Sequence, residues 1–332
     1  MGASFTHPPA LEGRMTQYIL RRLLISIPLL FGITLIIFTL ANLMPGDALT
    51  AMVTDEAPIA GEVLAVRRAH LGLDKPMPIR YLIWIRSLAG GNMGYSFVTN
   101  VPIGQTVARR VPATLELMGT SLLFSIIVGI ILGIISALKQ YSVPDYILTV
   151  LGFAGQSVPI FFLGMFLIYV FALRLRWLPT SGMGTAGEAF ALKDNLRHLL
   201  LPALSLGVLR TAVFMRYTRA SMLDVLQSEY MTVARAKGLL ERVVIIRHGL
   251  RNALIPIITV IGLNLPVLFA GAVIIETIFQ WPGIGLLYIT AVSHRDYPMI
   301  MGLALVSSIA VLVSNLLTDI AYAFADPRIR YD

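Results

Sequence analysis

The side chains that could carry out chemistry in this 332-residue chain do not form the patterns that catalysis or metal binding requires. The five histidines lack the spacing of metal ligands, and the absence of cysteine excludes thiolate chemistry. A glycine-rich phosphate loop ends in Gly-Lys, but no glycine precedes any lysine of the chain, namely Lys75, Lys139, Lys193 and Lys237. We therefore expect no catalytic residue, no cofactor and no metal site in this chain, and no ATP hydrolysis by it.

The remaining candidate for a functional element is the basic stretch EYMTVARAKGLLERVVIIRHGLRNALIP, residues 229–256. As a helix, 229–237 places Tyr230, Val233 and Ala234 on one stripe, and Gly238 can end it with a positive φ. A second short amphipathic helix is expected over 239–248. Two short helices joined at small residues would form a knob suited to close contact with another protein, but basic amphipathic helices also lie on anionic lipid. The residues alone leave both interpretations open.

Long apolar runs surround this stretch and define the architecture. The chain is 57% hydrophobic and 13% charged, against about 25% charged in an ordinary soluble domain. A bilayer core about 30 Å thick needs roughly 20 apolar helical residues per crossing. Uncharged runs of that length occupy 23–46, 117–138, 146–173, 252–275 and 297–318, and a sixth run, 199–215, is interrupted only by Arg210. Soluble α proteins seldom contain so many such helices. The sequence therefore predicts an all-α membrane protein with six transmembrane helices.

The distribution of basic residues predicts the orientation in the cell membrane. Short cytoplasmic loops are enriched in Lys and Arg. The segment between the runs 199–215 and 252–275 carries seven of these residues: Arg216, Arg219, Arg235, Lys237, Arg242, Arg247 and Arg251. With six crossings, both termini then lie in the cytoplasm, although the external loop 174–198 also holds four basic residues. Topology accounts for much of the net charge of +8, so we expect no nucleic-acid binding.

This topology divides the chain into five parts. We expect a cytoplasmic N-terminal segment over 1–22, a first transmembrane helix over 23–46, an external segment over 47–113, a five-helix core over 114–324 with a cytoplasmic loop at 217–250, and a cytoplasmic tail over 325–332. The first apolar run exceeds a signal-peptide core and should remain as an anchor, whereas residues 1–14 look dispensable.

Several features inside these parts carry further expectations. The external segment includes a helical pattern, IRYLIWIRSL, and should form a small cap on the bundle. GIILG at 129–133 permits close helix packing. Arg210 and Asp319 are charges within or at the ends of membrane helices. An interhelical ion pair or snorkelling is the simpler interpretation for both, and a role in a transport pathway is the alternative.

Taken together, the motifs resemble one family. EYMTVARAKGL followed by HGLRNALIP resembles the EAA motif of permease subunits of ATP-binding-cassette importers. YILRRLLISIPLLFGITLIIF, HLGLDKPMPIRYLIWI, VPATLEL, RYTRASMLDVL, ETIFQWPGIG and DPRIRY extend the resemblance over nearly the whole chain, to the first of the two permeases of dipeptide and oligopeptide (peptide/nickel) importers. The sequence departs from the wider superfamily at Thr232, where glutamate is frequent.

The resemblance implies a type I importer permease fold and a set of partners. The EAA loop would be a coupling helix that docks on a separate ATPase, which binds ATP and Mg²⁺, through Tyr230, Thr232, Ala234, Arg235, Ala236, Lys237, Gly238 and Leu239. The partners would be a second homologous permease, two ATPases, an external substrate-binding protein and the lipid bilayer. An external gate or a contact with the binding protein would involve Glu276, Trp281, Pro282 and Gly283, although a plain structured loop is equally compatible.

The implied function is a translocation pathway for peptides or similar small polar solutes. Nickel complexes and oligosaccharides are alternative substrates within the same family. An ion-gradient-driven secondary transporter is the main alternative of another class, but it would need titratable groups at mid-membrane, and the helix interiors offer almost none. A membrane scaffold without transport would not explain the basic loop.

Overall fold

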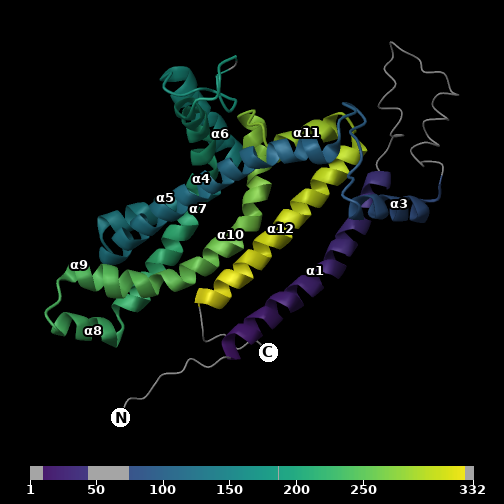
Figure 1. Cartoon of the computed structure of the whole chain (residues 1–332). Coiled ribbons are helices and arrows are strands. Elements are labelled where there is room, and N and C mark those ends of the chain that lie inside the picture. Colours follow the sequence, from purple (N-terminus) through teal and green to yellow (C-terminus); the bar gives the residue numbers. More distant parts are fainter. Residues whose placement is uncertain (1–9, 44–74, 186, 326–332) are drawn as a thin grey trace.

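The computed structural model describes residues 10–43, 75–185 and 187–325, which fold into helices with no β-strand beyond an isolated bridge between Tyr95 and Pro102 (Figure 1). The helices are α1 Ala10–Leu43, α3 Met77–Ala89, α4 Ile103–Leu138, α5 Val143–Ser157, α6 Ile160–Leu167, the π-helical segment η2 Ile168–Arg174, α7 Leu192–Leu226, α8 Glu229–Ala236, α9 Glu241–Val243, the π-helical segment η3 Val244–Leu250, α10 Arg251–Ile278, α11 Ile284–Ser293 and α12 Tyr297–Ala325.

Four helices are long and apolar enough to cross a membrane without interruption: α1 over Leu20–Leu43, α4, α7 and α12 over Tyr297–Ile320. Two bent pairs of helices meet the same requirement of length and apolarity when each pair is taken together, Val143–Ser157 with Ile160–Arg174 and Glu241–Leu254 with Pro256–Gly262. Counting each bent pair as one span gives six, in agreement with the expected six-helix fold.

The third crossing is not the straight helix that the run 146–173 indicated. The chain bends by 104° between α5 and α6. The cause is local, because Pro159 has no N–H to continue the helix and its ring forces the preceding residue out of the helical region. Val158 accordingly adopts an extended conformation, with φ −80° and ψ 125°.

Helix α4 begins before the apolar run that predicted the second crossing, within the expected external segment 47–113. Helix α4 starts at Ile103 and continues through Pro112, so residues 103–113 are helical. Glu116 ends the uncharged run, and Arg109 and Arg110 interrupt the apolar pattern further, which conceals this extension. Of the expected cap, 44–74 lies outside the described residues. The predicted helix is α3, where Tyr81 and Trp84 pack against Phe38 of α1, and the Tyr81 hydroxyl lies 2.9 Å from that of Thr34.

Helix α7 lies at the centre of the bundle, and its contact with α4 is the most extensive in the fold. Two glycines of α4 permit this approach. A Cβ atom on Gly129 would lie 2.5 Å from the Cβ of Phe214, and one on Gly133 would lie 2.5 Å from the Cβ of Thr218. The packing role expected for GIILG is therefore confirmed. Helix α10 packs between α7 and α12, and α1 packs along α12 (Figure 1).

Polar contacts fix both ends of the bundle. In Figure 1, α8 and α9 lie toward the same lower end as the start of α1 and the end of α12, and α3, α6 and α11 lie at the upper end. At the lower end, Arg219 binds both oxygens of Asp145 at 2.8 Å, joining α7 to α5. Arg22 pairs with Asp319 at 3.0 Å, which confirms the interhelical ion pair expected for Asp319. At the upper end, Asp296 accepts a hydrogen bond of 2.5 Å from Ser96.

Candidate docking site on the basic segment

Helix α8 and the loop that follows it project from the lower end of the bundle (Figure 1). The helix begins after Ser228, which is extended at φ −72° and ψ 150°, and ends at Ala236. Gly238 follows with φ +74°, and its N–H donates to the carbonyl of Arg235 at 2.9 Å. This left-handed conformation favours glycine and terminates the helix. The conformation predicted for Gly238 is confirmed.

One face of α8 anchors it to the rest of the chain. Met231 and Ala234 are buried and form a cluster with Val244 of η3, against which Val225 and Leu226 of α7 also pack. Helix α8 is therefore attached both to the end of α7 and to the segment that leads into α10. A displacement of α8 would be passed to both of these long helices.

The opposite face of α8 and the loop after it expose apolar side chains. The exposed fractions are 43% for Tyr230, 53% for Val233, 41% for Leu239 and 76% for Leu240. The apolar surface is bordered by charges, since Arg235 binds Glu241 at 3.0 Å and Lys237 is exposed. The hydrogen bond to Glu241 raises the pKa of Arg235 above its usual value, so this side chain stays charged. An exposed apolar surface with a polar rim is typical of a protein-docking site.

The structure places seven of the eight expected contact residues on this exposed surface: Tyr230, Thr232, Arg235, Ala236, Lys237, Gly238 and Leu239. The exception is Ala234, which is only 6% exposed and belongs to the anchor. The expected stripe was wrong in register, because Met231 and Ala234 face inward while Tyr230 and Val233 face outward. Val233 and Leu240 were not predicted as contact residues, although their exposed apolar side chains extend the same surface.

The prediction of a separate short helix over 239–248 was also wrong. Helix α9 covers only Glu241–Val243, and η3 continues it over Val244–Leu250 directly into α10. Gly249 lies inside this continuous helical stretch and is buried, and a Cβ there would lie 3.4 Å from the terminal methyl of Met231. The glycine therefore serves close packing under α8 and does not end a helix.

At the upper end, Glu276 of α10 binds the start of α11. Its carboxylate accepts hydrogen bonds from the hydroxyl of Thr114 at 2.6 Å and from the N–H groups of Gly285 at 2.7 Å and Leu286 at 3.1 Å. A carboxylate at this position satisfies N–H groups that have no partner within the helix and interacts favourably with its dipole. Gly283 makes the approach possible, since a Cβ there would lie 2.2 Å from the carboxylate.

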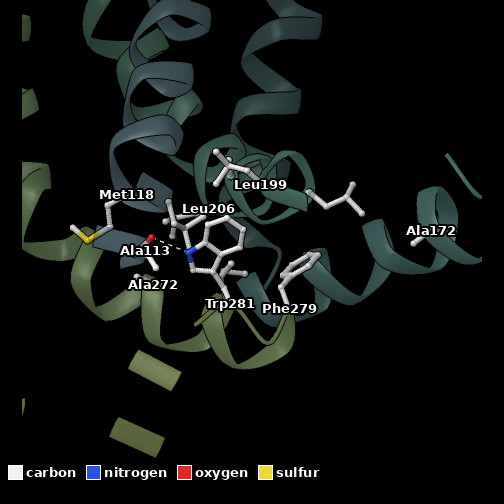
Figure 2. Packing of buried hydrophobic residues seen from close by; sticks show 12 residues of the cluster. Ala113, Met118, Ala172, Leu199, Leu206, Ala272, Phe279 and Trp281 are labelled. Carbon is white, nitrogen blue, oxygen red and sulfur yellow. Dashed lines mark hydrogen bonds between the residues drawn. The ribbon is translucent and has the colours of Figure 1, made fainter. Parts of the chain in front are cut away.

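Trp281 completes the connection between α10, α11 and α4. Its indole N–H donates to the carbonyl of Ala113 at 2.8 Å, and its ring is fully buried beside Leu199, Leu206 and Phe279 (Figure 2). Glu276, Trp281 and Gly283 are buried, and Pro282 is half-buried. A role of these four residues in an external gate or in contact with a binding protein stays a prediction.

Comparison with known proteins identifies the family. Residues 129–331 match the family described as binding-protein-dependent transport system inner membrane component, and residues 15–118 match the N-terminal part of such membrane components. The chain belongs to this family. The oligopeptide transport system permease AppB of Bacillus subtilis is 41% identical over 318 residues, covering 96% of this chain and all of AppB. The di/tripeptide permease DppB of Pseudomonas aeruginosa is 42% identical over 336 residues, covering 96% and 99%.

The glutathione transport system permease GsiC of Pectobacterium atrosepticum is 40% identical over 317 residues, covering 96% of this chain and all of that relative. Among solved structures, the inward-facing MetNI methionine ABC transporter aligns with a TM-score of 0.52 at 13% identity, covering 67% of this chain and 97% of the other. At this identity the likeness concerns the fold alone, which is that of a type I importer permease.

As an inner-membrane component of a binding-protein-dependent transport system, the chain is a permease subunit and not an enzyme, because the ATPase of such systems is a separate subunit. Within the described ranges, no three His, Asp or Glu residues form a group that could hold a metal ion.

The first prediction concerns Glu276 of this permease. Replacing Glu276 by alanine leaves the Thr114 hydroxyl and two backbone N–H groups without their acceptor in a buried position, at a cost of about 1 to 3 kcal/mol. We expect a melting temperature in detergent several degrees below that of the wild type. The control is Glu188→Ala, which removes an exposed glutamate at the same end of the bundle and should leave the melting temperature unchanged. Equal melting temperatures for the two variants would contradict the capping role.

Proposed function

We propose that this permease is one of two homologous membrane subunits of an ATP-driven importer of peptides or similar small polar solutes. The observation that carries the proposal is the helix α8, which is anchored inside by Met231 and Ala234 and exposes Tyr230, Val233 and Leu240 on its outer side. Relatives whose names specify oligopeptides, di/tripeptides and glutathione support peptides as the substrate class.

The distribution of charge supports a cytoplasmic location for α8 and for both termini. The seven basic residues between Arg216 and Arg251 surround α8, and the start of α1 and the end of α12 lie toward the same end of the bundle (Figure 1). In this orientation α8 faces ATPase subunits, which bind ATP and Mg²⁺, and α11 faces an external substrate-binding protein. The apolar outer face of α8 would enter a groove of the ATPase, with Lys237 and the Arg235–Glu241 pair at its edge.

The attachment of α8 indicates how closure of the ATPases would be transmitted to the membrane helices. Helix α8 follows α7 after Gln227 and Ser228, and Met231 contacts the cluster that includes Val244, from which η3 leads into α10. Movement of α8 would therefore displace the cytoplasmic ends of α7 and α10 together. Since these helices cross the bilayer, the change would alter which side of the pathway between the two permeases is open.

A secondary transporter driven by an ion gradient is the main alternative. Such a transporter needs titratable or ion-coordinating groups at mid-membrane. In the described part of α7 and α10, the charged group nearest the helix midpoints is Arg210, which does not titrate in the physiological range. Nickel complexes and oligosaccharides are alternative substrates of the same ATP-driven mechanism.

The second prediction tests the mechanism by reconstitution. Proteoliposomes containing this chain, its partner permease and both ATPases should accumulate a peptide such as trialanine when the binding protein and ATP are supplied. The chain alone should neither hydrolyse ATP nor transport. Accumulation driven by a proton or sodium gradient without ATP would contradict the proposal, and uptake of a nickel complex or an oligosaccharide in place of peptides would correct its substrate class.

A further inference from the structure

Arg210 extends into the middle of the membrane region. It lies on α7, and its guanidinium donates a hydrogen bond of 2.6 Å to the side-chain oxygen of Asn264, at the middle of α10 Arg251–Ile278. Asn264 is itself held by a bond of 2.7 Å from its amide nitrogen to the carbonyl of Val260. At 1.5 Å per residue, Asn264 lies about 20 Å along the helix from the cytoplasmic Arg251. Arg210 therefore does not snorkel to the cytoplasmic surface, as one interpretation of the sequence suggested.

Arg210 borders an open face of α7. Helix α4 packs on one side of α7 through Gly129 and Gly133, and α5 packs on the next through Gly152, where a Cβ would lie 3.6 Å from the Cβ of Ala212. Helix α10 covers a third side through Arg210 itself. The sector that remains, between α5 and α10, carries Tyr217, which lies two helical turns after Arg210 and is 49% exposed, whereas Val213 between them packs against Ile257 and Val260 of α10.

The charge of Arg210 is not balanced by the part of the chain that the structure describes. Within these residues no carboxylate lies within ion-pair distance of Arg210, whereas Arg22 and Arg219 are paired with Asp319 and Asp145. The partner of Arg210 is a neutral amide. A charge at this depth is costly against lipid, so it faces a water-filled pathway or a partner and is expected to bind an anion. The open face of α7 is therefore a face toward the pathway or the second permease.

We propose that Arg210 binds the terminal carboxylate of a peptide as it passes through the pathway. This inference rests on the proposed function in peptide import. A free peptide carries this carboxylate whatever its side chains are, and a guanidinium recognises a carboxylate through two parallel hydrogen bonds. The bond to Asn264 holds the guanidinium at the edge of the open face while leaving most of its five N–H groups for a ligand. A single site of this kind binds transiently, as passage requires.

A carboxylate of the second permease is the alternative partner of Arg210. In that case the charge would stabilise the pair of permeases and would not contact the solute. The two interpretations differ in what an Arg210 variant loses, because a solute site affects uptake in an intact assembly, whereas an interface ion pair affects the assembly itself.

The third prediction uses variants in the complete reconstituted importer. Arg210→Gln should lower trialanine uptake at least about tenfold, as expected for loss of a charge-assisted hydrogen bond, while the second permease and the ATPases still co-purify. Arg210→Lys should retain part of the uptake because the charge remains. Asn264→Ala should have a smaller effect than Arg210→Gln. The matched control is Arg216→Gln, which removes an exposed basic residue of α7 that lies over the ring of Phe153, and it should transport normally.

A second measurement tests peptide binding to the permease–ATPase assembly in the absence of the binding protein. Millimolar trialanine should raise the melting temperature of the detergent-solubilised permease–ATPase assembly more than trialanine amide does, and Arg210→Gln should abolish that difference. Equal responses of the wild type to both probes, or normal uptake by Arg210→Gln, would overturn the inference. Loss of the second permease from the purified Arg210→Gln assembly would assign Arg210 to an interface ion pair. Absence of trialanine uptake by the wild type would instead contradict the proposed function.

Discussion

Replacing Gly238 by valine should abolish ATP-driven uptake while leaving membrane insertion intact. Gly238 has φ +74°, a region in which a β-branched side chain is strained. A Cβ at this position meets no atom of the chain within 4 Å, so it would project into the space in front of the docking surface. The substitution therefore combines two effects: it displaces Leu239 and Leu240 relative to α8, and it adds bulk where a partner groove must approach.

The control for this fourth prediction separates backbone strain from docking. Gly91, at the opposite end of the bundle, has φ +79°, and a Cβ there also meets nothing within 4 Å. Gly91→Val introduces a similar local strain away from the ATPase and should retain most of the uptake. The measurements are trialanine uptake, ATPase rate and co-purification of the ATPases. Normal uptake with bound ATPases in Gly238→Val would remove Gly238 from the coupling surface, and equal losses in both variants would show that strain alone is responsible.

The six crossings could be predicted from sequence because each contains an apolar run long enough for the bilayer, with Arg210 the only charge in the six runs, and such runs are visible without knowledge of their neighbours. Their shapes could not be predicted in this way. An uncharged run can include Pro159, where the third crossing bends. The run 117–138 ends at Glu116, whereas α4 continues back through Arg110 and Arg109 to Ile103, because a helix can extend beyond the hydrocarbon region. Charge limits where a helix is buried in lipid, but it does not limit where the helix begins.

In the candidate sites, features that depend on neighbouring residues in the sequence could be predicted, whereas contacts between residues distant in the sequence could not. Gly238 could be predicted because the need for a positive φ is local. The inward face of α8 could not, because a two-turn helix has several plausible stripes and the choice depends on contact with Val244 and Val225. The partner of Glu276 was equally inaccessible, since Thr114 is 162 positions away in the sequence. Arg210 was recognised as unusual, but its bond to Asn264 was not.

The last prediction concerns the contact on which the coupling depends. Gly133→Val should prevent recovery of a stable permease, because a Cβ at Gly133 would lie 2.5 Å from the Cβ of Thr218 and 2.7 Å from the carbonyl oxygen of Met215. A backbone oxygen cannot rotate away as a flexible side chain can, so α4 and α7 would have to separate. Overpacking of this kind costs about 3 kcal/mol, and here it falls on the most extensive helix contact of the fold.

Gly119→Val in the same helix is the matched control, since a Cβ there meets no atom within 4 Å. It replaces a poor helix former in an open position and should leave the permease stable. The yield of monodisperse protein and its melting temperature in detergent would distinguish the two variants. If Gly133→Val were as stable as Gly119→Val, α4 and α7 would not be closely packed in the membrane. Helix α7 would then lack the rigid support that it needs to convert a displacement of α8 into movement of the pathway.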